Sequence, residues 1–87
     1  MDNITYKGFT IRAIPFHLKG DKWSTYFFIH VRRSEKTSHR PFSAPDTFPT
    51  EEEAVVHCLQ FGMDIIDGKV EGRTVEDLYL QAHSGDL

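Results

Sequence analysis

Two segments rich in strand-forming residues, on either side of one glycine, constrain the fold of this chain more than any other feature. Residues 4–16 alternate apolar with polar side chains, and residues 22–33 are rich in aromatic and β-branched types, so each segment predicts a β-strand. The loop between them, residues 19–21, contains Gly20 and is short enough for a tight hairpin. We therefore expect the first part of the chain to form an antiparallel hairpin.

A three-residue loop also predicts the register of this hairpin. Ile11 then faces Ile29, with Phe9 opposite Val31 and Ala13 opposite Phe27, so that one face is apolar and suited to a core. The other face is more polar and carries Thr10, Arg12, Ile14, Tyr26, Phe28, His30 and Arg32. A slip of one residue would exchange the two faces, and Pro15 leaves room for a bulge that would change the register.

A third and weaker strand is expected over residues 39–48. Pro41 and Pro45 interrupt this segment. Because proline cannot donate a hydrogen bond to a central ladder, the segment predicts an edge strand or a partly irregular one.

The next segment predicts a helix. Thr50 can cap its first turn, and Glu53 occupies the position that completes a capping box. The acids at residues 51–53 complement the positive end of the helix dipole. Apolar residues recur with helical spacing up to Ile66, and Gly68 is a typical stop, so we expect a helix from about residue 51 to residue 67.

Two residues inside this helix carry further predictions. Gly62 costs about 1 kcal/mol relative to alanine in a helix interior, and we expect this cost to be offset by close approach of the helix to the sheet. Cys58 lies in the same apolar row as Gly62. This placement predicts a buried, structural cysteine rather than an exposed nucleophile.

The order of these elements predicts an α+β fold, in which a three-stranded antiparallel sheet packs against one main α-helix (β-β-β-α). Residues 74–81 predict a short second helix, so that one domain covers residues 1–82 and residues 83–87 form a flexible tail. A single helix covers one face of such a sheet. The other face is then left to solvent or to a partner.

Composition narrows the class of protein. A chain of 87 residues supports one domain. Its net charge of −3 divides unevenly: eight bases and four acids give +4 over residues 1–48, and two bases and nine acids give −7 over residues 49–87. One cysteine excludes an intrachain disulfide, and no signal peptide or membrane-spanning run is visible. We expect a cytoplasmic protein without membrane contact.

A wider pattern supports these expectations. The chain resembles a group of small uncharacterised bacterial domains in the order of four segments. These segments are Tyr6-Lys7-Gly8-Phe9-Thr10-Ile11, then Trp23, then Phe48-Pro49-Thr50-Glu51-Glu52-Glu53-Ala54, then Ile65-Ile66-Asp67. More remotely, the chain resembles the three-strand-plus-helix DNA-binding modules of the AP2 type and of integrase arm-binding domains. That second resemblance implies binding of duplex DNA by the sheet, with Trp23 as the matching residue and Arg12 and Arg32 as weaker counterparts.

No set of residues in the sequence predicts catalysis, a cofactor or a metal site. The five histidines lack metal-ligand spacing, and the glutamates of residues 51–53 are explained by capping. The candidate site is instead a binding face made of Arg12, Tyr26, Phe28, His30 and Arg32. We expect a non-enzymatic interaction module, with an unidentified protein partner or a second copy of the chain bound through this face or through the edge strand. The alternative is a nucleic-acid-binding module that uses the same aromatic and basic face.

Overall fold

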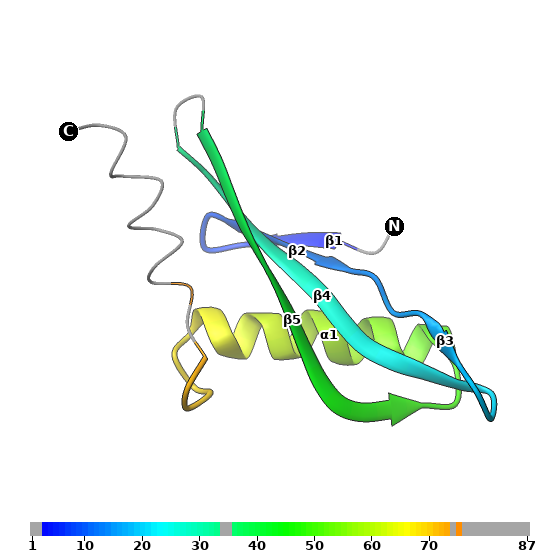
Figure 1. The fold of residues 1–87 in the computed structure, drawn as a ribbon. Coiled ribbons are helices and arrows are strands. Elements are labelled where there is room, and N and C mark those ends of the chain that lie inside the picture. The colour runs from blue at the N-terminus through cyan, green and yellow to red at the C-terminus, as the bar shows by residue number, and fades with distance from the viewer. Residues whose placement is uncertain (1–2, 34–35, 74, 76–87) are drawn as a thin grey trace.

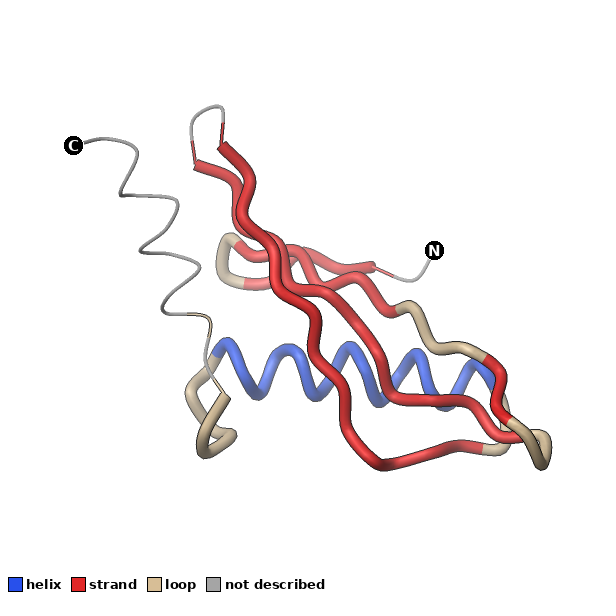
Figure 2. Tube along the Cα trace, viewed as in Figure 1, coloured by secondary structure: helices blue, strands red, loops and turns tan. Residues whose placement is uncertain are grey.

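One five-stranded antiparallel sheet and one helix make up the architecture of this computed structural model, which describes residues 3–33, 36–73 and 75. The helix lies across one face of the sheet, so the two form separate layers (Figures 1 and 2). In chain order the elements are β1 (Asn3–Tyr6), β2 (Phe9–Ala13), β3 (His17–Leu18), β4 (Lys22–Arg33), β5 (Lys36–Phe48) and α1 (Glu51–Ile66).

The centre of the sheet is β4. Strands β2 and β3 pair in succession along one side of β4, and β5 pairs along the other side. Strand β1 pairs with the outer side of β2. Among the described strands, β5 is therefore an edge strand, as its two prolines predicted.

The predicted class, α+β with an antiparallel sheet and a main helix, is confirmed, but the predicted number of strands was wrong. The segment expected to form one strand over residues 4–16 forms two, β1 and β2, and the short strand β3 follows it. Lys7 and Gly8 both have positive φ angles, +51° and +86°, and make a two-residue turn between β1 and β2. Positive φ at both central residues is what the type I′ hairpin turn requires. Pro15 then separates β2 from β3.

The predicted hairpin register is confirmed. Ile11 pairs with Ile29, and the neighbouring pairs follow in the same register as far as Leu18 and Lys22. Pro15 therefore introduces no bulge on this side of β4. The irregularity lies on the other side, where Pro45 and Asp46 are extra residues of β5 opposite the Ser24–Thr25 step.

The helix begins and ends almost as its sequence predicts. The Thr50 hydroxyl accepts a hydrogen bond from the Glu53 amide at 3.1 Å. The helix ends at Ile66, one residue earlier than expected, and Gly68 follows with a φ of +74°. The expected second helix over residues 74–81 and the tail at residues 83–87 lie, apart from Val75, outside the described residues.

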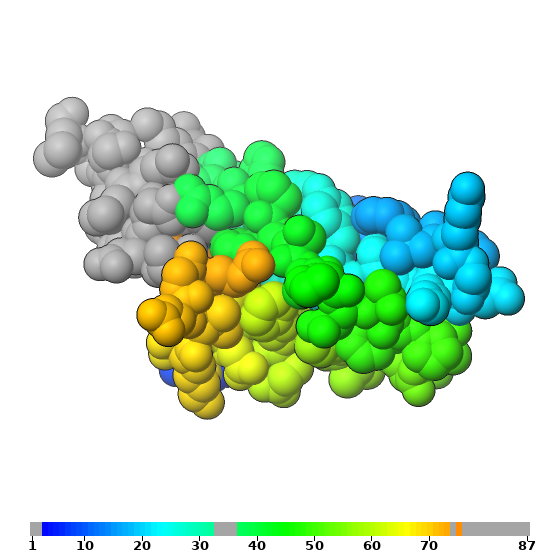
Figure 3. Space-filling view, turned by 60° about the horizontal axis from the view of Figure 1, so that its bottom comes forward, coloured from blue at the N-terminus to red at the C-terminus, as the bar shows by residue number. Residues whose placement is uncertain are grey.

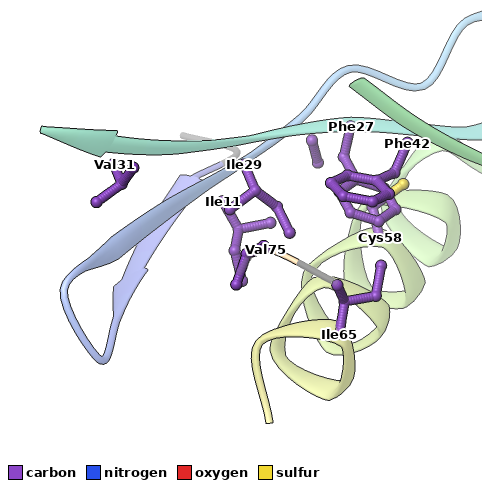
Figure 4. Close-up of a cluster of buried hydrophobic side chains, with 9 residues drawn as sticks. Ile11, Phe27, Ile29, Val31, Phe42, Cys58, Ile65 and Val75 are labelled. Carbon is purple, nitrogen blue, oxygen red and sulfur yellow. The ribbon is translucent and has the colours of Figure 1, made fainter. Parts of the chain in front are cut away.

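The core fills the space between α1 and the sheet (Figure 4). Phe27 is fully buried and lies between two other rings, stacked on Phe42 at 5.6 Å and edge-on to Phe61 at 5.8 Å. The helix packs closely against the sheet at Gly62, where an added Cβ would lie 2.7 Å from Cγ2 of Ile11. The predicted close approach at this glycine is thus confirmed.

The C-terminal end of α1 is also joined to the β1–β2 turn. Asp67 accepts hydrogen bonds from the Tyr6 hydroxyl at 2.8 Å and from the Lys7 ammonium at 2.5 Å. The bonds from Lys7 and Tyr6 lower the pKa of the Asp67 carboxyl, and the same bonds raise the pKa values of both donors. Figure 3 shows the helix layer, with the loop of residues 68–73 (gold) beside the end of the helix.

Candidate binding face

The sheet face turned away from α1 is the candidate functional surface, and we call it the open face. Its side chains come from alternate positions of the long strands and from the matching positions of their neighbours. The described residues of the open face are Asn3, Thr5, Thr10, Arg12, Ile14, Phe16, Tyr26, Phe28, His30, Arg32, Thr37, His39, Pro41 and Ser43.

The structure brings all five residues of the predicted face to this one surface. Arg12 pairs with Phe28 across β2 and β4, and Tyr26, His30 and Arg32 continue the same side of β4. Both arginines are exposed, and the three rings are half-buried. Neither arginine forms an ion pair with a described acidic side chain.

A continuous series of ring contacts runs along the open face. Phe16 meets Tyr26 edge-on at 5.9 Å, and Tyr26 meets Phe28 edge-on at 5.6 Å. The series then changes character, because Phe28, His30 and His39 contact one another at 5.7–6.1 Å with interplanar angles of only 27–45°. We call these last three residues the ring platform.

Sequence reasoning missed two members of this series. His39 lies directly opposite His30, on β5. Its position depends on the β4–β5 register, and the prolines of β5 concealed that register. Phe16 follows Pro15 at the end of the first hairpin arm and is 51% exposed. Its position on the open face was available from the confirmed register, in which it follows Ile14 by two residues.

The electrostatic character of the open face differs from that of the whole chain. It contains two arginines and two histidines but no aspartate or glutamate among its described residues. Partial burial lowers the pKa of His30, and the nearby His39 and Arg12 lower it further. The acids of the described chain lie largely on and after α1, including all three glutamates of its first turn.

The other chemically notable side chains do not form a reactive set. Cys58 is fully buried, as predicted, donates to the Tyr26 carbonyl oxygen at 3.5 Å, and has a pKa raised by burial. His57 lies beside Asp46, with 3.5 Å between Nε2 and Oδ2, and packs between Phe48 and Phe61. Within the described residues, no three potential ligands are grouped in a way that could hold a metal ion.

Trp23, the residue that best matched the DNA-binding modules, lies near the start of β4. Its ring contacts that of His17 at 5.1 Å, and its backbone pairs with Phe48 of β5. It takes no part in the ring contacts of the open face.

Comparisons with protein-family models, with curated proteins and with solved structures found no match for this chain. In the described part of the chain, no helix has the length and apolar character needed to cross a membrane.

Proposed function

We propose that this chain is a small non-enzymatic binding module that acts through its open face. The observation that carries this proposal is the series of rings from Phe16 to His39, on the side of the sheet that α1 does not cover. Ring surface in contact with water is unfavourable, and a partner that covers it removes that cost. The core of the protein is built on the opposite face, so these rings are not required to fill it.

The geometry favours the open face over the free edge of β5. Ile14 donates to the Tyr26 carbonyl, so Tyr26 and the alternate residue Phe28 direct their backbone groups toward β2. Pro41, which pairs with Phe28, therefore has its nitrogen on the outer edge of β5. Because proline carries no N–H, this edge lacks a donor near the middle of the strand and is a poor template for another strand.

A site-specific crosslinking experiment tests the proposal. The photoreactive amino acid p-benzoylphenylalanine is introduced at position 28 of the full chain, and at position 56 as a control. Val56 is 64% exposed on α1, on the opposite side of the molecule from the open face. We expect irradiation of the producing cells to give covalent adducts from position 28 and none from position 56.

Adducts of either chemical kind, protein or nucleic acid, support a binding role for the open face. The same adducts from both positions, or none from position 28, would overturn the proposal. Thermal unfolding of each labelled protein verifies that the substitution has not changed the fold.

A further inference from the structure

We infer that the open face binds single-stranded nucleic acid, with bases stacked on the ring platform and phosphates held by Arg12 and Arg32. This inference rests on the proposed function and names the class of partner. It follows from the geometry of the rings, the charge around them and the spacing along the strand.

The ring platform has the geometry of a stacking surface. Phe28 and His30 are neighbours on β4 with an interplanar angle of 27°, and His39 of β5 is tilted by 35° from His30 and 45° from Phe28. Nucleic-acid bases stack on aromatic side chains of this kind. Such stacking tolerates any base sequence, because every base has a π face.

Positive charge flanks this platform on two sides. Arg12 lies opposite Phe28 on β2, and Arg32 lies two residues beyond His30 on β4. A guanidinium can hold a phosphate through two parallel hydrogen bonds. Both arginines are exposed, and among the described residues neither has an acidic partner.

The charge of the open face also argues against a second copy of the chain as the partner. In a two-fold symmetric dimer the same patch is used by both subunits. An open face with cations and no described acid would then meet another face of the same sign. A polyanion is the complementary partner.

The ring spacing favours a single strand over a duplex. Contacting rings of the platform lie 5.7–6.1 Å apart, whereas bases within one strand of a duplex follow each other at about 3.4 Å. A duplex also keeps its base faces stacked on each other. A single strand can separate its bases and lay them on protein rings.

The test uses the full chain and three fluorescent probes: dT10, rU10 and a ten-base-pair DNA duplex. We expect the anisotropy of dT10 or rU10 to rise with protein and that of the duplex to respond far less. Two neutralised phosphates give a loss of affinity of about sevenfold between 50 and 200 mM salt. The two single-stranded probes distinguish DNA from RNA.

Variants assign the binding to the proposed residues. Arg12→Gln with Arg32→Gln should abolish most of the salt dependence, and Phe28→Thr should weaken binding about tenfold through the loss of stacking. Val56→Thr is the control, because Val56 is an apolar residue of α1 that is 64% exposed and lies on the side of the molecule away from the open face. This control should bind as the unchanged protein does.

Two results would overturn the inference. One is the absence of single-strand binding at 50 mM salt by a folded protein, and the other is duplex binding as tight as single-strand binding. If crosslinking from position 28 still gives a protein adduct, only the class of partner is wrong. If position 28 gives no adduct at all, the proposed function fails as well.

Discussion

At the scale of single residues, a close contact between helix and sheet depends on the absence of a side chain at Gly62. Cγ2, Cδ1 and Cγ1 of Ile11 lie 2.7, 2.9 and 3.1 Å from the place where a Cβ would be. Ile11 is completely buried, so it cannot move aside into solvent. Glycine lowers helix propensity, but at this position only glycine allows the helix to pack so closely against Ile11.

Gly62→Ala should therefore destabilise the protein. The helix gains about 1 kcal/mol in propensity, but overpacking a core costs about 1–3 kcal/mol, so we expect a net loss of about 1 kcal/mol. Chemical denaturation measures this loss. Gln60→Ala, at an exposed position of the same helix, should change stability by less than about 0.5 kcal/mol.

A double variant identifies the cause. Ile11→Ala removes all three crowding atoms, so its combination with Gly62→Ala should cost less than the two single changes added together. Greater stability of Gly62→Ala than of the unchanged protein would refute the steric explanation.

At this scale, a local structure could be predicted from the sequence where neighbouring residues alone determine it. Thr50 and Glu53 were predictive because a capping box needs only four consecutive residues. The Lys7-Gly8 turn was missed because lysine seldom adopts the positive φ that it has here. Gly8 was the available signal, but the alternation on both sides of it predicted one continuous strand.

At the scale of elements, the outer edge of β5 is protected by Pro41. The neighbouring outward-facing positions, His39 and Ser43, keep their amide donors, so the proline leaves a gap between them. This gap separates the edge into two short sections. A pairing strand would have to cross it without a hydrogen bond.

Pro41→Thr should restore the missing donor and promote association between copies along β5. We expect the apparent mass in sedimentation velocity to rise with protein concentration for this variant and to rise less for the unchanged protein. Pro49→Thr is the control, because Pro49 lies in the link after the strand. Equal association of Pro41→Thr and Pro49→Thr would contradict the protective role.

The same element shows why only part of the candidate site could be predicted. A short glycine loop fixed the register of β2 on β4, and the five predicted face residues depended on that register alone. His39 depended on the register of β5 on β4, in which Arg33 pairs with Lys36 and His30 with His39. The third strand was expected only from residue 39, so the pairs that set this register were not part of the prediction.

At the scale of the whole molecule, Asp67 connects parts of the chain that are about sixty residues apart. It joins the end of α1 to the first hairpin through Tyr6 and Lys7. The carboxylate is the acceptor of both bonds, and its pKa is lowered by them. Its contribution to stability is therefore present above the unfolded-state pKa of about 3.9 and is lost as the pH falls through the lower folded-state value.

Asp67→Asn should accordingly lower stability at pH 7 and make a progressively smaller difference as the pH falls below about 3.9. Urea denaturation of both proteins across this pH range measures the difference. Asp64→Asn removes the same charge near the same end of α1, but among the described residues the Asp64 side chain accepts its hydrogen bond from the nearby Gln60. The stability loss in Asp67→Asn could prove independent of pH, or equal to the loss in Asp64→Asn. Either result would exclude the proposal that Asp67 stabilises the fold by joining α1 to the first hairpin.

The separation of charge between the two sides of the sheet has a consequence for how this molecule meets others. Its net charge of −3 is a sum over unlike surfaces, since the described acids gather mainly around the helix and are absent from the open face. Electrostatic influence extends only about 8 Å at physiological ionic strength. A charged partner at close range therefore interacts with the surface it approaches rather than with the net charge. This interaction orients the protein relative to the partner before contact. Diffusional orientation, and retention on an ion exchanger, should follow that local field rather than the sum.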